Sequence, residues 1–273
     1  MEFLAQGTWT KRMHPGWAAH SGIIAAMLAR EGYTGPSTIL EGKTGFLHGY
    51  SHDTNPAEVV EELGKVFYVA RTSVKPYSAC RYKHGPIDGI RKIVAENSLK
   101  ADDVSEVNIG MLEVAYPIIV DPPATKINPQ SIVDAQFSMP FGAAVAILFG
   151  NALPDQYTME IIKSPKVAEL MKKVCCKKDP ELEKVFPKKW PATVEIRTTS
   201  GKVYSAYVEY PKGDPENPLS WEELIEKFNS VTRHVYSADR QRKIADEVRC
   251  LNESTSLGAL QTSIGARDFD QRL

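Results

Sequence analysis

The sequence contains few cysteines. Its 273 residues include four, Cys80, Cys175, Cys176 and Cys250, and no two of them have the C-x-x-C spacing of a zinc or redox motif. The adjacent Cys175 and Cys176 could pair only as an unusual vicinal disulfide. We therefore expect reduced thiols.

The sequence also contains few of the ligands that a metal site would need. Cys80 and His84 lie four residues apart and could form half of a zinc site. No second Cys/His pair has ligand spacing, so we expect neither a metal nor another cofactor.

The chain has almost no net charge and no long apolar run. Its 33 basic and 34 acidic residues leave a formal charge of −1, so we expect neither nucleic acid nor an anionic membrane as a partner. No apolar run approaches the roughly 20 residues that span a bilayer, and residues 1–5 lack the features of a signal peptide. We expect a cytoplasmic globular protein, since 42% apolar residues suffice for a core.

The first 70 residues have a helical pattern. Pro15 suits the first turn of a helix over residues 16–30, and Gly32 suits its end. This helix is apolar all round and rich in small side chains, so we expect it to lie buried in a helical bundle.

Lys11, Arg12 and His14 immediately precede that helix. Two cations and an imidazole at a helix entrance suit an anionic ligand. The alternative is a solvated basic turn.

Residues 73–84 hold the densest reactive chemistry: one cysteine, one arginine, one histidine, two lysines and two tyrosines. Pro76 favours extended backbone at Lys75, and residues 87–96 have helical spacing. We therefore predict a loop that delivers its side chains at a helix start. The helix terminus, Lys75 and Arg81 together favour a carboxylate or another anion.

The remaining pattern is mixed. Residues 104–114 alternate as a strand that places Tyr116 at its end, where packing is the alternative to a functional role. A long helix is expected over residues 131–149, with Pro140 as a possible kink. Short helices are expected over 154–190 and a hairpin over 193–210.

Two more helices complete the expected layout. A capping box begins one at Ser220, another covers residues 237–251, and a frayed tail follows Ile264. The fold class is therefore α+β: helical pieces over 1–70 and 213–273 flank an α/β domain over 71–212.

Four blocks of the sequence stand out: residues 11–22 (KRMHPGWAAHSG), 39–42 (ILEG), 75–80 (KPYSAC) and 128–138 (NPQSIVDAQFS). Together and in this order they resemble the MmgE/PrpD family, which includes 2-methylcitrate dehydratase, cis-aconitate decarboxylase and iminodisuccinate epimerase. The resemblance covers nearly the whole chain.

The resemblance implies a large helical domain and a smaller α/β lid, with the active site in the cleft between them. Residues 71–212 would form the lid. Lys11 corresponds to the lysine of the helical half, Lys75 to the lid lysine and Tyr116 to the lid tyrosine. Cys80 falls where the decarboxylase branch has a histidine, and His84 is the nearest imidazole to replace it. This departure favours a dehydratase, isomerase or epimerase over a decarboxylase.

The resemblance also implies a carboxylate substrate and a further N-terminal helical part, which we expect a separate chain to supply unless this chain is a truncated product. Dimers are usual in the family. We expect metal-independent proton abstraction next to a carboxylate, followed by loss of water or by reprotonation on the other face. A non-catalytic binding subunit is the alternative. The predicted catalytic residues are Lys75, Cys80, His84 and Tyr116, and the predicted substrate-binding residues are Lys11, Arg12, His14 and Arg81.

Overall fold

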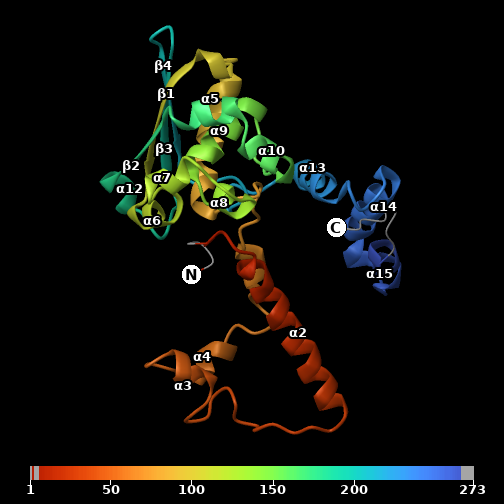
Figure 1. Cartoon of the computed structure of the whole chain (residues 1–273). Helices are drawn as coiled ribbons and strands as arrows, with labels where there is room; N and C mark the ends of the chain where they lie inside the picture. Colours follow the sequence, from red (N-terminus) through yellow and green to blue (C-terminus); the bar gives the residue numbers. More distant parts are fainter. Residues whose placement is uncertain (1, 3–5, 266–273) are drawn as a thin grey trace. The chain divides into compact units, whose positions relative to one another are not determined.

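The computed structural model describes residue 2 and residues 6–265 (Figure 1). The chain divides into two compact units, Met1–Thr72 and Ser73–Leu273, which we call unit 1 and unit 2. Residues 213–273 fall in unit 2, and the assignment of chain segments to a lid and a helical domain stays a prediction.

Unit 1 is helical. It contains α2 (Thr10–Arg30), α3 (Phe46–Tyr50), α4 (Pro56–Val60) and η1 (Tyr68–Arg71). Helix α2 begins six residues earlier than residue 16, where we predicted its start, so Pro15 lies inside it. The fixed φ of proline is helical, and the helix continues through Pro15 at the cost of one backbone hydrogen bond.

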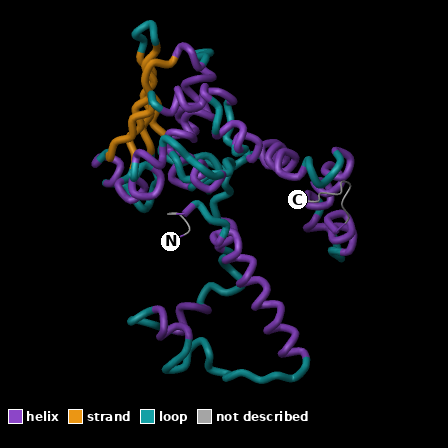
Figure 2. Tube along the Cα trace, viewed as in Figure 1, coloured by secondary structure: helices purple, strands orange, loops and turns teal. Residues whose placement is uncertain are grey.

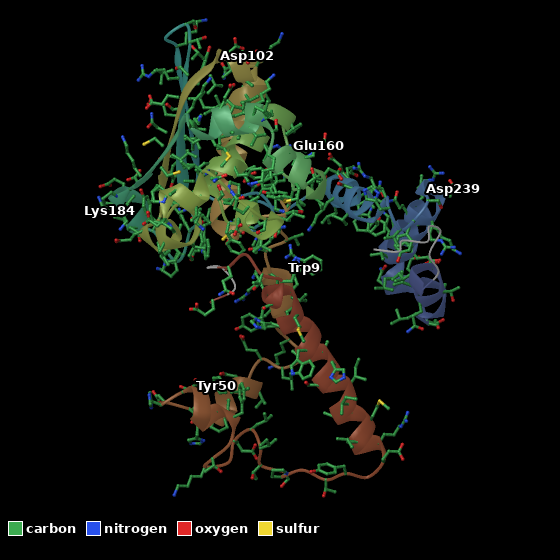
Figure 3. All side chains as sticks on the ribbon, viewed as in Figure 1. Trp9, Tyr50, Asp102, Glu160, Lys184 and Asp239 are labelled. Carbon is green, nitrogen blue, oxygen red and sulfur yellow. The ribbon has the colours of Figure 1, made fainter. Side chains whose placement is uncertain are left out.

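The prediction that this helix is buried is wrong for the described chain. None of the residues of α2 is buried, because α3, α4 and η1 are too short to form a layer over it. Trp9, just before α2, and Tyr50, at the end of α3, are 77% and 82% exposed (Figure 3). Unit 1 therefore presents a large apolar surface.

Unit 2 contains a four-stranded sheet in the order β2-β1-β3-β4 (Figure 2). Strand β1 (Val104–Met111) pairs parallel with β2 (Val174–Lys178) and antiparallel with β3 (Ala192–Thr198), which pairs antiparallel with β4 (Val203–Val208). The hairpin is confirmed, as is the α+β fold class.

Strand β2 corrects the sequence prediction, which expected only short helices over residues 154–190. Val107 pairs with Val174, and Met111 pairs with Lys178. Lysines suit an edge strand because they oppose pairing with another chain. The local pattern was too short to separate this strand from helix, and the pairing with β1 decides it.

Helices α5 (His84–Glu96) and α9 (Met139–Phe149) pack together, and α5 also contacts β3 and β4 (Figure 1). Helix α5 begins at His84, not at residue 87 as predicted, because Pro86 is tolerated in a first turn. Its residues Ile87, Ile90 and Ile93 are at most 2% exposed and belong to the core.

The predicted long helix over residues 131–149 is two helices. Helix α8 (Ile132–Gln136) ends before Ser138, whose hydroxyl accepts the Phe141 N–H at 3.1 Å and caps α9. Pro140 therefore lies in the first turn of α9 and produces no kink.

Tyr116 is not at a strand end. Strand β1 ends at Met111, and η4 (Glu113–Ala115) leads into α6 (Tyr116–Ile119), which Tyr116 begins. Pro117 suits the first turn of this helix.

The capping box is confirmed, since Ser220 and Glu223 cap each other at the start of α13 (Trp221–Thr232). The last predicted helix is found as α14 (Ala238–Arg249), and the end of the predicted frayed tail, 266–273, lies outside the described residues. Over the described residues, no helix combines the length and apolarity needed to cross a bilayer. The remaining elements of unit 2 are η2 (Arg81–Lys83), η3 (Ala101–Asp103), α7 (Pro123–Lys126), η5 (Pro154–Gln156), α10 (Met159–Ile162), α11 (Pro165–Met171), α12 (Pro180–Glu183), α13 (Trp221–Thr232), η6 (Leu251–Glu253) and α15 (Gly258–Gly265).

Candidate functional site

Two predicted site residues meet at one backbone carbonyl in unit 2. The exposed Lys75 donates from Nζ to the Ala79 carbonyl at 3.3 Å, and His84 Nε2 lies 3.4 Å from the same oxygen. That carbonyl directly precedes Cys80. The loop therefore holds a lysine and an imidazole at the peptide group that precedes Cys80.

His84 is buried and neutral. His84 is only 1% exposed, and its Nδ1 has no hydrogen-bond partner. Burial lowers the pKa of His84 to about 3, helped by the nearby charge of Arg81 and opposed by the bond to Ala79. The Tyr77 ring packs edge-on against the imidazole, with 5.3 Å between the centroids.

Arg81 is paired inside unit 2. Its guanidinium donates to both carboxylate oxygens of Asp214, and Ser73 Oγ donates to Asp214 Oδ1 at 2.7 Å. The side chains of Arg81 and Asp214 are 18% and 7% exposed. The charge of Arg81 is therefore balanced by that of Asp214, and this ion pair connects the loop of residues 73–84 to the segment after β4.

A backbone contact reinforces this fastening. The Val74 N–H donates to the Gly213 carbonyl at 2.8 Å. Gly213 has φ +91°, and a Cβ there would lie 1.8 Å from the Val74 oxygen. Only glycine fits this crossing. We call the contacts among Ser73, Val74, Arg81, Gly213 and Asp214 the Asp214 clasp.

A second buried network ties the loop to α5. Tyr77 donates its hydroxyl proton to Asp88, while Arg91 Nη1 donates to the Tyr77 oxygen at 2.8 Å. Asp88 also accepts the Lys212 N–H at 2.7 Å. Burial raises the pKa of both Tyr77 and Asp88. Sequence reasoning assigned no role to these residues.

Cys80 is half-buried, and its backbone N–H donates to the Gln136 carbonyl at 3.0 Å. Beside it lies Lys83, which is 0% exposed and donates from Nζ to the Ala135 carbonyl at 2.9 Å. Burial lowers the pKa of Lys83 to about 7. Lys126 lies close enough for its charge to lower that pKa further, and burial likewise lowers its own pKa.

Sequence reasoning missed Lys83. It stands in the reactive stretch, but no pattern separates it from a solvated lysine. Its burial depends on the junction between α8 and α9, 52 residues along the chain. No signal in a single sequence could have identified that contact.

Tyr116 is anchored on the sheet. Its hydroxyl donates to the Cys176 carbonyl of β2 at 3.3 Å, and Lys178 lies 5.6 Å from the ring centroid. Burial, followed by the charge of Asp121, raises the pKa of Tyr116. The preceding residue, Ala115, lines a cavity of about 10 Å³ with Arg81, so α6 begins near the loop.

The other predicted substrate-binding residues lie in unit 1. Lys11, Arg12 and His14 are exposed residues of the first two turns of α2, inside the helix and not before it as predicted. Lys11 and His14, three residues apart, share one face. The structure thus gathers Lys75, Cys80, Arg81 and His84 in unit 2 and Lys11, Arg12 and His14 in unit 1. Among residues 2 and 6–265, no three His, Cys, Asp or Glu side chains are grouped to hold a metal ion.

The fold is an α+β domain in which a loop rich in cations leads into the start of a helix. The chain belongs to the MmgE/PrpD family: residues 77–253 match the MmgE/PrpD C-terminal domain, and residues 1–59 match the MmgE/PrpD N-terminal domain.

Several curated proteins are similar to the chain. A "cis-aconitate decarboxylase-like protein oryM" of Aspergillus oryzae is 25% identical over 261 residues, covering 92% of this chain and 54% of that protein. Cis-aconitate decarboxylase of Aspergillus terreus is 24% identical over 268 residues, covering 93% and 54%. The human protein of the same name is 26% identical over 263 residues, covering 93% and 53%. The chain spans about half the length of these relatives.

Proposed function

We propose that the chain is the C-terminal half of an MmgE/PrpD lyase that acts on a small di- or tricarboxylate. The reaction is abstraction of a proton next to a carboxylate, followed by loss of water, as in 2-methylcitrate dehydratase. The observation that carries the proposal is the meeting of Lys75 and His84 at the Ala79 carbonyl beside Cys80, at the point in the chain where the match to the family's C-terminal domain begins.

The residues of unit 2 suit different parts of this reaction. Lys75 is exposed and cationic, so it binds a substrate carboxylate and stabilises the enolate-like charge. Cys80 takes the proton from carbon, and Tyr116 donates one to the departing hydroxyl so that it leaves as water.

His84 and Arg81 are better placed to hold the loop than to touch substrate. The neutral, buried imidazole donates to the Ala79 carbonyl, and its lowered pKa makes it a weak base. The guanidinium of Arg81 is paired with Asp214. Both side chains therefore position Lys75 and Cys80. Lys11, Arg12 and His14 stay proposed substrate ligands from unit 1.

The exposed surface of unit 1 suits a helical partner. Trp17, Ile23 and Met27 of α2 are 61%, 63% and 49% exposed. Apolar areas this large mark interaction sites. The family's N-terminal domain matches only residues 1–59, and the relatives are about twice as long as the region matched. We propose that a further helical segment of that domain covers this surface, with a second copy of the chain as the competing occupant.

The test is to assay the chain alone and after coexpression with an N-terminal MmgE/PrpD helical segment. The substrates tested are 2-methylcitrate and cis-aconitate, and their conversion is monitored by NMR in deuterated water. The proposal expects dehydration of 2-methylcitrate in the coexpressed sample and loss of that activity in Lys75→Met. Absence of any turnover or exchange with each substrate would instead favour a non-catalytic binding subunit.

Decarboxylation is a second candidate, because the similar curated proteins are named cis-aconitate decarboxylases. Release of carbon dioxide from cis-aconitate would identify it. Deuterium exchange with inversion, without loss of water or carbon dioxide, would identify an epimerase of the same family.

A further inference from the structure

Lys83 is a buried lysine that the proposed chemistry does not use. It is 0% exposed. Its ammonium donates to the Ala135 carbonyl at 2.9 Å and the Gln136 carbonyl at 3.4 Å, and it lies 3.5 Å from the Tyr157 hydroxyl. A buried lysine needs such partners, and here the last turn of α8 supplies two of them.

The surroundings are shaped for this side chain. The ammonium lies 5.4 Å from the centroid of the Tyr157 ring and 5.9 Å from that of Phe141, so two aromatic rings complement its charge. A Cβ on Gly142 would lie 2.5 Å from Lys83 Cε. Glycine at this position leaves the room that the lysine occupies.

Hydrogen bonds connect Lys83 to Cys80 in a closed ring. The Lys83 backbone N–H donates to the Cys80 carbonyl at 3.0 Å, and the Cys80 N–H donates to the Gln136 carbonyl at 3.0 Å. The Lys83 ammonium donates to that same Gln136 oxygen. The backbone of Cys80 is therefore held from both sides, with Lys83 as the shared member.

We propose that Lys83 is a positioning residue that fixes the Cys80 backbone against the junction of α8 and α9 and makes the order of this loop depend on pH. The effect of this positioning on catalysis rests on the proposed function of Cys80. The positioning of the Cys80 backbone by Lys83 does not depend on that function.

The sign of the pH dependence follows from burial. The titratable groups near the ammonium are the Cys80 thiol, the His84 imidazole, the Lys126 ammonium and the Tyr157 hydroxyl. We call the loop closed when Lys83 is buried and open when Lys83 is in water. The pKa of Lys83 is about 7 in the closed loop and 10.5 in the open loop, so between these values the open loop binds more protons than the closed one. The closed loop therefore gains stability as pH rises above about 7, and the gain is absent below it.

The test is amide hydrogen exchange, measured residue by residue on the full chain, with Lys83→Met compared with the native chain. In the native chain we expect the protection factor of the Cys80 amide to rise between pH 7 and pH 8.5, by at most about tenfold per unit. In Lys83→Met we expect no such rise, and at pH 8.5 a protection factor lower by about tenfold.

Two controls keep the result specific. Lys189→Met removes a half-buried lysine that pairs with Glu209 and also lies over a tyrosine ring, 5.6 Å from the Tyr210 centroid, and it should change nothing at Cys80. Gly142→Ala crowds the Lys83 tip and should lower Cys80 protection even if Lys83→Met does not fold.

A native protection factor that stays flat from pH 7 to pH 8.5 would overturn the proposal. So would an equal fall at the amides of β3 and β4 in Lys83→Met, because it would reveal general destabilisation. Exchange needs no turnover, so failure of the proposed activity leaves this test intact.

Discussion

At the scale of single residues, the sequence predicted a loop that gathers reactive side chains, but not which of its charged groups are paired or buried inside the fold. Lys75, Cys80, Arg81 and His84 lie in one loop of unit 2, and their roles stay predictions. The pairing of Arg81 with Asp214 and the burial of Lys83 could not be foreseen, because each depends on a partner far along the chain. Charge and spacing alone do not distinguish a ligand-binding cation from a buried one.

His84 provides a prediction about pH. Its pKa is about 3 when folded and 6.5 when unfolded, so the unfolded state binds more protons between these values. The stability from the neutral imidazole is complete above about pH 6.5 and is lost as pH falls towards 3. Relative to His84→Gln, the native free energy of unfolding should fall by up to about 1.4 kcal/mol per unit from pH 6.5 to pH 4.

Urea unfolding at several pH values checks this slope. His234→Gln, at an exposed histidine, is the matched control and should keep the native dependence. A difference between native and His84→Gln that does not change with pH contradicts the neutral, buried imidazole.

The Asp214 clasp provides a second prediction. Asp214→Asn keeps the shape and an acceptor for Ser73 but leaves the Arg81 guanidinium without its counter-charge. We expect a loss of about 3 kcal/mol in the free energy of unfolding, measured by urea titration. Glu181→Gln breaks an exposed pair with Lys184, and it should cost at most about 1 kcal/mol. Similar losses in the two variants would show that the clasp is only a surface ion pair.

At the scale of elements, strong local signals were sufficient and weak ones were not. The hairpin and the Ser220 capping box were predicted because alternation and capping act within a few residues. Strand β2 was missed because its five residues are defined by pairing with β1. The division between α8 and α9 was missed because a proline such as Pro140 has the same local sequence pattern whether it kinks one helix or lies in the first turn of a new one. Here Ser138 and Pro140 begin a new helix.

The packing of α5 on β3 is testable at Gly89. A Cβ there would lie 2.8 Å from Val194 Cγ2, inside the core. Crowding costs about 1–3 kcal/mol, while alanine gains about 1 kcal/mol in helix propensity, so Gly89→Ala should lose about 1 kcal/mol net by urea unfolding. Adding Val194→Ala makes room for the new methyl group. The double variant should therefore be more stable than the sum of the single effects predicts, and strict additivity would refute the contact.

At the scale of the whole molecule, family membership was predictable from ordered sequence blocks, while the exposure of α2 was not. Its apolar composition predicts a helix that packs against partners. Composition cannot show whether the packing partners of a helix belong to the same compact unit. The other helices of unit 1 do not cover α2, since none of the residues of α2 is buried.

This exposure predicts association. The chain alone should self-associate in light scattering, and Ile23→Glu with Met27→Glu should suppress it, because residues four apart share a helix face. The same pair should block assembly with the N-terminal helical segment. Val231→Glu, at an apolar residue 43% exposed on α13, is the control and should leave both unchanged. Undiminished assembly of the double variant would place the interface elsewhere.

Whether the loop around Lys75 receives carboxylates is tested most directly by calorimetry with tricarballylate, an unreactive tricarboxylate, and the chain assembled with the helical segment. We expect saturable binding, weakened at least about tenfold in Lys75→Met, since the lost contact is charge-assisted. Binding should be unchanged in Lys189→Met. Equal affinity of the native and Lys75→Met proteins for tricarballylate would contradict the account.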